Sequence, residues 1–152
     1  MNEQSAMAEH TIVTERELDA PRDLVWKMWT DPDEVTKWWG PEHFTTPRET
    51  IEFDLRPGGV CRLTMIGPDG EEYPSDGHFG IVEPPERLSF GEETTDHPMI
   101  ESGETTVEFI DLGNDRTKVV VRSRLICAEG LVSMAQAGWA SQLDKLECVL
   151  SG

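Results

Sequence analysis

The chain has 152 residues, a length typical of one domain built around one hydrophobic core. Its formal net charge is −17, because 30 Asp and Glu residues stand against 13 Lys and Arg residues. Nucleic acids and anionic membrane surfaces attract Lys and Arg, so this charge argues against both as partners. No stretch of the sequence is apolar over the length that a membrane-spanning helix requires.

The cysteines and the N-terminal residues indicate a cellular compartment. Cys61, Cys127 and Cys148 are odd in number and far apart, which gives neither a disulfide framework nor a metal-ligand pattern. Such thiols are typical of a reducing cytoplasm. The first ten residues are polar and acidic and lack the apolar segment of a signal peptide. We therefore expect a soluble, cytoplasmic protein with a flexible segment at residues 1–10 and a single domain at residues 11–152.

The first elements are predicted to be a strand and a helix. Residues 11–19 alternate loosely and are rich in Thr, Ile and Val, which favours a strand. Pro21 suits the first turn of a helix. The apolar residues that follow lie on one side of such a helix: Leu24, Val25, Met28 and Trp29.

A second, short helix is predicted just behind the first. Asp31 is a good N-cap and Pro32 suits the first helical position. The helix is expected to carry Trp38 and Trp39 and to end before Pro41. Neighbouring helical residues point about 100° apart, so the two rings cannot share one face. One ring can enter the core while the other borders a cavity; plain core packing of both rings is the alternative.

From residue 48 onwards the apolar period changes to two, which indicates strands. Turns rich in Gly, Pro, Asn and Asp separate them, and we interpret the Arg-Pro-Gly-Gly string at 56–59 as one such hairpin turn. His97 and Pro98 are expected in a longer loop. The sequence predicts a meander of about six strands, at residues 51–55, 61–65, 73–83, 87–93, 107–109 and 117–125.

The last predicted element is one long amphipathic helix over residues 128–150. Its apolar residues fall on a single stripe: Ala128, Leu131, Val132, Ala135, Trp139, Leu143, Leu146 and Leu150. Gln142 lies close to the centre of this stripe. A buried amide there needs a hydrogen-bond partner or a wet cavity.

This order of elements predicts an α+β fold with a curved antiparallel sheet of six or seven strands. The long helix must bury its apolar stripe against the concave face of the sheet. Pairing between the first and last strands is expected to close the sheet into a strongly curved layer. A straight helix cannot lie flush on such a layer, so we expect a cavity, covered at one end by the two short helices.

Several short strings occur in one order along the chain: APR at 20–22, VW at 25–26, TDP at 30–32, KWWGP at 37–41, DLRPGG at 54–59 and EPPERL at 83–88. With them, the chain resembles homologues of the activator of the heat-shock-protein-90 ATPase, from about residue 11 to residue 150. The element order is similar to the helix-grip fold of START-like proteins and the birch-pollen-allergen family, within the SRPBCC superfamily. The resemblance implies this fold with a pocket, and it does not imply a particular activity.

The leading hypothesis is that the cavity binds a small hydrophobic molecule. Such sites are mostly apolar with a few orienting polar groups. The polar candidates are Tyr73, His78 and Gln142; each also has an ordinary structural explanation as an edge tyrosine, a strand-surface histidine or a satisfied core amide. The apolar candidates are Trp38, Trp39, Phe44, Met65, Phe79, Phe90, Trp139 and Leu143.

Two other functions stay open at this point. One is an enzyme of the cyclase, dehydratase or isomerase type that uses the same pocket, with His78 as general acid or base. The other is a protein that contacts a heat-shock-protein-90 homologue through its outer surface. The sequence contains no G-x-S-x-G, P-loop, G-x-G-x-x-G or H-E-x-x-H string, and we expect neither a cofactor nor a metal site.

The net charge generates the first prediction. The protein should pass through a heparin column at physiological salt without retention, because its negative field repels a polyanion. In a flotation assay, vesicles of anionic lipid should bind no more protein than neutral vesicles do. Retention on heparin, or a preference for the anionic vesicles, would contradict the prediction by revealing a basic patch.

Overall fold

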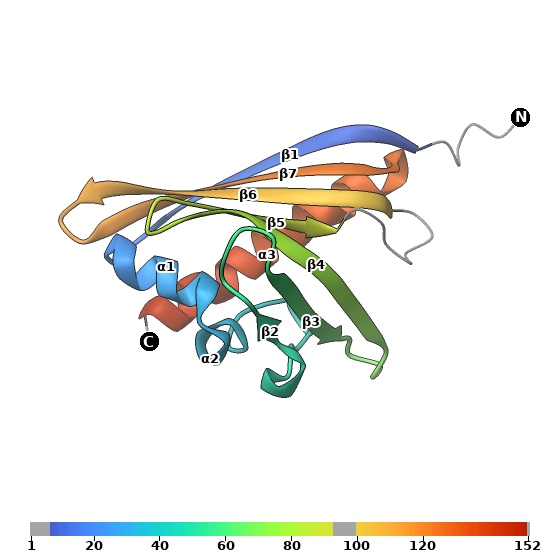
Figure 1. Cartoon of the computed structure of the whole chain (residues 1–152), viewed down its shortest axis with the longest axis horizontal. Helices are drawn as coiled ribbons and strands as arrows, with labels where there is room; N and C mark the ends of the chain where they lie inside the picture. The colour runs from blue at the N-terminus through green and yellow to red at the C-terminus, as the bar shows by residue number, and fades with distance from the viewer. Residues whose placement is uncertain (1–6, 93–99, 152) are drawn as a thin grey trace, which may run out of the picture.

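Seven antiparallel strands form one open sheet with the order β1-β7-β6-β5-β4-β3-β2 in a computed structural model that describes residues 7–92 and 100–151 (Figure 1). The strands are β1 (Met7–Leu18), β2 (Glu52–Phe53), β3 (Val60–Ile66), β4 (Glu72–Glu83), β5 (Arg87–Glu92), β6 (Ile100–Gly113) and β7 (Arg116–Ala128). The helices are α1 (Arg22–Thr30), α2 (Pro32–Val35) and α3 (Val132–Ser151), with short 3₁₀ turns η2 (Arg48–Thr50) and η3 (Glu129–Leu131).

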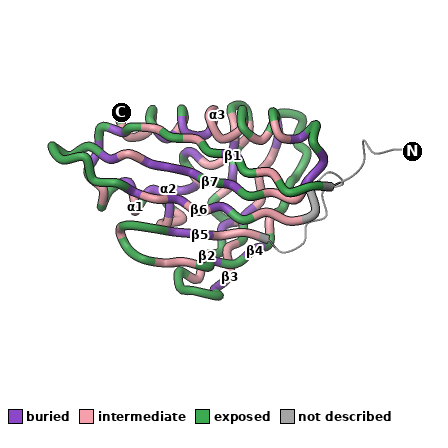
Figure 2. Tube along the Cα trace, turned by 90° about the horizontal axis from the view of Figure 1, so that it is seen from above, coloured by how far each residue is buried: buried purple, intermediate pink, exposed green. Residues whose placement is uncertain are grey.

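The long helix α3 crosses one face of the sheet, and α1 and α2 lie near the C-terminal end of α3 on that same face (Figure 1). Buried residues gather between the sheet and the helices, while the turns at the strand ends are exposed (Figure 2). The predicted α+β helix-grip architecture is therefore confirmed. None of the described helices is long and apolar enough to cross a membrane.

The sheet differs from the prediction at its edges. The first strand does pair with the last, but the sheet stays open because β1 and β2 form its two opposite edges. Strand β1 begins at Met7 rather than at residue 11, since Met7 and the residues after it pair with the last residues of β7. Residues 7–10 are thus part of the sheet and not of a flexible segment. The loop expected at His97 and Pro98 lies outside the described residues.

Two predicted elements are shorter than expected. Strand β2 covers only Glu52–Phe53, because the backbone turns back at Asp54, whose N–H bonds to the Val60 carbonyl. Helix α2 ends at Val35, so both tryptophans lie in the turn that follows it. The predicted N-cap is confirmed, since the Asp31 carboxylate accepts a hydrogen bond from the Asp33 N–H at 3.0 Å.

Helix α3 is continuous through Gly138, as predicted, but it begins at Val132 instead of residue 128. Ala128 still belongs to β7, and a 3₁₀ turn makes the corner between the strand and the helix. The apolar stripe is buried most deeply in the C-terminal half of the helix, where Leu143 and Leu146 are fully buried.

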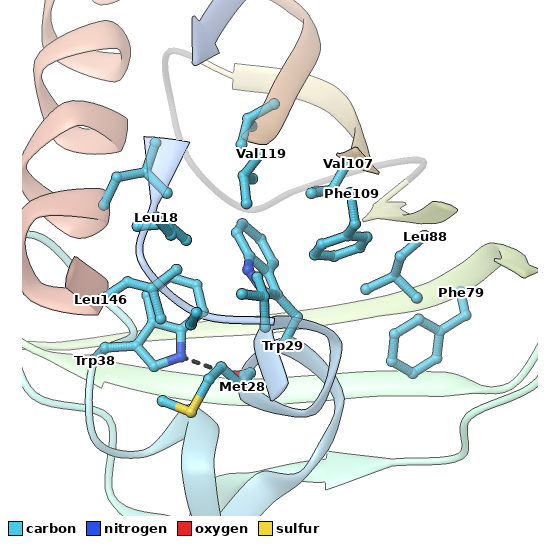
Figure 3. Packing of buried hydrophobic residues seen from close by; sticks show 14 residues of the cluster. Leu18, Met28, Trp29, Trp38, Phe79, Leu88, Val107, Phe109, Val119 and Leu146 are labelled. Carbon is cyan, nitrogen blue, oxygen red and sulfur yellow. Dashed lines mark hydrogen bonds between the residues drawn. The ribbon is translucent and has the colours of Figure 1, made fainter. Parts of the chain in front are cut away.

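The core forms where α1, the C-terminal half of α3 and the sheet meet (Figure 3). Trp29 lies at its centre, with ring centroids 4.7 Å from Trp38 and 6.0 Å from Phe109. Trp38 is fully buried, and its indole N–H donates to the Met28 carbonyl at 2.8 Å. Such edge-on aromatic contacts add stabilisation beyond the burial of apolar area.

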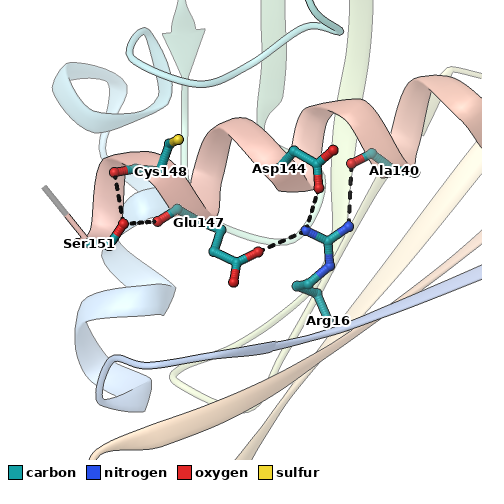
Figure 4. Close-up of polar contacts among 6 residues, drawn as sticks. All are labelled: Arg16, Ala140, Asp144, Glu147, Cys148 and Ser151. Atoms are coloured by element: carbon teal, nitrogen blue, oxygen red, sulfur yellow. Dashed lines mark hydrogen bonds and ion pairs between the residues drawn. The ribbon is translucent and has the colours of Figure 1, made fainter.

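A polar contact fixes the opposite side of α3 to the sheet (Figure 4). Arg16 on β1 bonds to the carboxylates of Asp144 at 2.7 Å and Glu147 at 3.0 Å, which lie one turn apart. Its other terminal nitrogen lies 3.5 Å from the Ala140 carbonyl. The guanidinium thus fixes the position of the helix across the edge strand.

The burial of each side chain on α3 predicts how much stability is lost when that side chain is shortened to alanine. Leu146→Ala should lower the free energy of unfolding by about 2–5 kcal/mol, because it leaves a void in a fully buried position. Met134→Ala is the matched control on the same helix; its side chain is 66% exposed, and the change should stay within about 0.5 kcal/mol. Urea unfolding measures both, and equal effects would contradict this packing of the helix.

Candidate functional site

A cavity of about 840 Å³ lies between the inner face of the sheet and the N-terminal half of α3. The loop at residues 40–44 contributes to its wall, as do α1 and strands β2 to β7. Its wall is predominantly apolar and aromatic. The lining residues are Trp29, Trp39, Pro41, Phe44, Phe53, Cys61, Leu63, Met65, Glu72, Tyr73, Pro74, Ser75, Gly77, Phe79, Phe90, Gly91, Gly103, Thr105, Ser123, Leu125, Met134, Ala135, Gly138, Trp139 and Gln142.

The structure brings most of the sequence-predicted candidates together in this wall: Trp39, Phe44, Met65, Tyr73, Phe79, Phe90, Trp139 and Gln142. Trp38 and Leu143 do not line the cavity, because both are fully buried in the adjoining core. The two neighbouring tryptophans divide as predicted, although neither is helical: Trp38 enters the core and Trp39 borders the cavity.

His78 does not belong to the cavity either. It is exposed on the outer face of β4, between the inward-facing Gly77 and Phe79. Successive strand residues point to opposite faces, so the His78 side chain points away from the cavity that Phe79 lines. His78 instead borders a second hollow of about 510 Å³, beside Glu104 and Arg124, which shares Phe79, Phe90, Gly91 and Gly103 with the cavity. An acid–base role for His78 inside the cavity is therefore a wrong prediction.

Four aromatic rings of the wall contact one another. Trp139 stacks on Trp29, with centroids 6.0 Å apart and ring planes 17° apart. Trp39 stands edge-on to Trp139 at 5.8 Å and to Phe90 at 5.7 Å. Rings in such contacts have little freedom to rotate, so the wall offers large flat apolar faces that are already in place.

Polar groups in the wall are few. Thr105 and Ser123 are directly opposite on β6 and β7, and their hydroxyls bond to each other at 3.0 Å. Tyr73 donates to the Glu71 carboxylate at 3.1 Å, and this hydrogen bond is the main cause that raises the pKa of Tyr73. The lining contains no Lys, Arg or His among the described residues, and Glu72 is its one carboxylate.

Two residues of α3 one helical turn apart, Ser141 and Lys145, hold the loop at residues 40–44 beside the cavity. Lys145 donates to the carbonyls of Gly40 at 2.9 Å and Phe44 at 3.1 Å, with the Pro41 carbonyl at 3.4 Å. The Ser141 hydroxyl accepts from the backbone N–H of Glu42 at 2.8 Å. Burial lowers the pKa of Lys145, which is consistent with a partly buried ammonium group among backbone carbonyls.

Some lining residues were missed by the sequence analysis. Cys61 and Leu63 share a strand face with Met65, so the two-residue period that placed Met65 already indicated them. Lys145 and the Thr105–Ser123 pair carry no such signal. Their roles depend on contacts between segments far apart in the chain.

Comparison with known proteins identifies the family. A family model described as activator of Hsp90 ATPase homolog 1-like protein matches residues 19–151. The chain belongs to this family. The resemblance drawn from the short strings is thereby confirmed. A search of curated proteins found no match.

Solved structures confirm the fold of this family member. A protein from Chromobacterium violaceum superposes with a TM-score of 0.83 at 23% identity, over 93% of this chain and 97% of that one. A protein from Nitrosomonas europaea gives 0.78 at 24% identity, over 93% and 94%. One from Arthrobacter aurescens gives 0.77 at 25% identity, over 93% and 86%.

The contacts of Lys145 predict a local effect. Lys145→Met removes the donors that hold residues 40–44, so the amide of Glu42 should exchange hydrogen faster. The free energy of unfolding should fall by about 1–2 kcal/mol at neutral pH. Lys37→Met is the control, because Lys37 is exposed and its ammonium bonds to Glu34. Hydrogen exchange with mass spectrometry measures the difference; equal exchange in both variants would contradict the role of Lys145.

The lowered pKa of Lys145 adds a pH dependence to this comparison. The folded protein releases this proton at a lower pH than the unfolded chain, whose lysine keeps its ordinary pKa of 10.5. Between those two values the unfolded state binds more protons, so rising pH stabilises the fold there. The difference in free energy of unfolding between the wild type and Lys145→Met should therefore grow as the pH approaches about 10.5. Urea unfolding at a series of pH values measures this difference, and a decrease over the same range would contradict a lowered pKa for Lys145.

Proposed function

We propose that the protein binds a small, mostly apolar molecule in the cavity between the sheet and α3. The observation that carries the proposal is the wall itself, a group of pre-positioned tryptophan and phenylalanine rings around about 840 Å³. Small-molecule sites typically measure roughly 300–1,000 Å³ and combine apolar walls with a few polar groups. Both features match this cavity.

The lining favours binding over catalysis. A general acid–base mechanism needs a titratable group inside the pocket, and His78 lies on the other face of the sheet. The titratable side chains of the wall, among the described residues, are Cys61, Glu72 and Tyr73. Tyr73 already bonds to Glu71 and its pKa is raised, so at neutral pH it stays protonated and is a poor proton donor.

Family membership supports a second proposal, contact with a heat-shock-protein-90 homologue through the outer surface. A pulldown with the purified chaperone separates the two proposals. Retention that is unaffected by filling the cavity supports the surface contact alone. Loss of retention when the cavity is filled would link the two functions.

Binding can be measured with N-phenyl-1-naphthylamine, a neutral apolar probe that fluoresces in dry surroundings. The probe should bind to the folded protein with enhanced emission and raise the melting temperature, because it binds only the folded state. Trp139→Ala should weaken the binding by about tenfold or more, since it removes a whole ring from the wall. An absence of probe emission and of any thermal shift across a panel of apolar compounds would overturn the proposal.

The cysteines provide an internal check on where the probe binds. Cys61 lines the cavity, Cys148 is exposed, and Cys127 is fully buried with a pKa raised by burial. Alkylation should therefore modify Cys148 first and Cys127 last. Saturating probe should slow the modification of Cys61 and leave Cys148 unchanged. Protection of Cys148 instead would place the probe on the outer surface.

A further inference from the structure

The loop at residues 40–44 presents three backbone carbonyls to one ammonium group. Lys145 on α3 donates to the Gly40 oxygen at 2.9 Å and to the Phe44 oxygen at 3.1 Å. The Pro41 oxygen lies 3.4 Å from the same nitrogen. An ammonium group has three N–H donors and no acceptor, which matches a set of three carbonyls. The loop backbone thus forms a cation site, and the partly buried Lys145 supplies the cation.

Two residues of this loop have a left-handed backbone. The φ of Gly40 is +99° and the φ of His43 is +75°. A residue with a side chain, such as His43, is strained in this region and stays there only where surrounding contacts hold it. Lys145 holds the carbonyls on both sides of His43, and the Ser141 hydroxyl holds the Glu42 N–H at 2.8 Å. The conformation of the loop therefore depends on its contacts with α3.

The loop places the Phe44 ring in the cavity wall. There the ring contacts Tyr73 on β4, with centroids 5.7 Å apart. The chain just after Phe44 is fixed to the sheet separately, because Thr45 and Ile66 exchange two backbone hydrogen bonds at 3.0 and 2.7 Å. Loss of the contacts with α3 would therefore release residues 40–44 and leave the chain attached to β3. The position of the Phe44 ring is the part of the wall that this release affects.

We infer that Lys145 is a positioning residue of the ligand site: its ammonium group fills the carbonyl site of the loop and thereby keeps Phe44 in the cavity wall. The inference rests on the proposed function, because it concerns the affinity of the same cavity for its ligand. Without the cation, the strained loop adopts other conformations, and only a fraction of the molecules has the complete wall. The apparent affinity falls in proportion to that fraction. A free alkylammonium ion that enters the carbonyl site restores the wall.

A double-mutant cycle tests whether Lys145 acts through Phe44. Fluorescence titration with N-phenyl-1-naphthylamine gives the affinities of the wild type, Lys145→Met, Phe44→Ala and the double variant. Lys145→Met keeps most of the side-chain volume and removes the N–H donors, so it should weaken binding by about threefold or more. In the Phe44→Ala background the same substitution should change the affinity by less than about twofold, because the ring that Lys145 positions is absent. Lys37→Met is the control, since Lys37 bonds to Glu34 on the surface, and it should leave the affinity unchanged.

Chemical rescue tests the cation site itself. Lys145→Ala lacks the atoms that n-propylammonium contains, three carbons and an ammonium group. Addition of n-propylammonium chloride should restore most of the lost affinity for the probe and slow the hydrogen exchange of the Glu42 amide. Tetramethylammonium chloride at the same concentration supplies charge and ionic strength but no N–H donor, so it should restore neither. The wild type and Lys37→Ala in the same salts control for effects of the ions on the probe.

Several results would overturn the inference. An equal loss of affinity from Lys145→Met with and without the Phe44 ring would show that Lys145 acts on the protein as a whole. Equal rescue by the two salts, or no rescue by n-propylammonium, would exclude the cation site. If Lys145→Ala does not fold, the cycle with Lys145→Met decides. If the probe does not bind to the wild type, the proposed function fails; if it binds equally well to the wild type and to Lys145→Met, the role of Lys145 alone fails.

Discussion

A straight helix can follow a curved sheet along only part of its length, and the rest of this structure depends on that constraint. The C-terminal half of α3 meets the sheet and the short helices, and there Leu143 and Leu146 are fully buried. The N-terminal half stands away from the sheet, so Ala135, Gly138 and Trp139 line a cavity. One amphipathic stripe thereby forms part of the core at one end and part of the cavity wall at the other.

Trp29 joins these two regions. Its ring contacts Trp38 on the core side and stacks on Trp139 on the cavity side. Packing in the core thus also fixes the orientation of rings in the cavity wall, so these side chains lose little further entropy in any complex. Lys145 also helps to fix the cavity wall. Its ammonium group holds the loop that contains Phe44 against α3.

The sequence was sufficient for the features that depend on local periodicity. The apolar stripe predicted α3, the Asp31-Pro32 pair predicted the start of α2, and the strand period predicted most of the meander. The alternation of strand side chains also separates His78 from the cavity, because its neighbour Phe79 points to the inner face. The pairing of Thr105 with Ser123 depends on the register of the β6–β7 hairpin, which shifts between Asp111 and Gly113, and Met7 pairs with Ala128 from the other end of the chain.

The cations of the protein are largely engaged on its outer surface. Arg62 bonds to Asp76 and Glu52, Arg122 bonds to Glu108, and Arg116 bonds to Glu17. Exposed pairs of this kind add little stability, but they place positive charge beside carboxylates and away from the cavity. The remaining carboxylates then set the sign of the field around the protein. A cavity with an apolar wall inside such a field is unfavourable for anions both on approach and after entry.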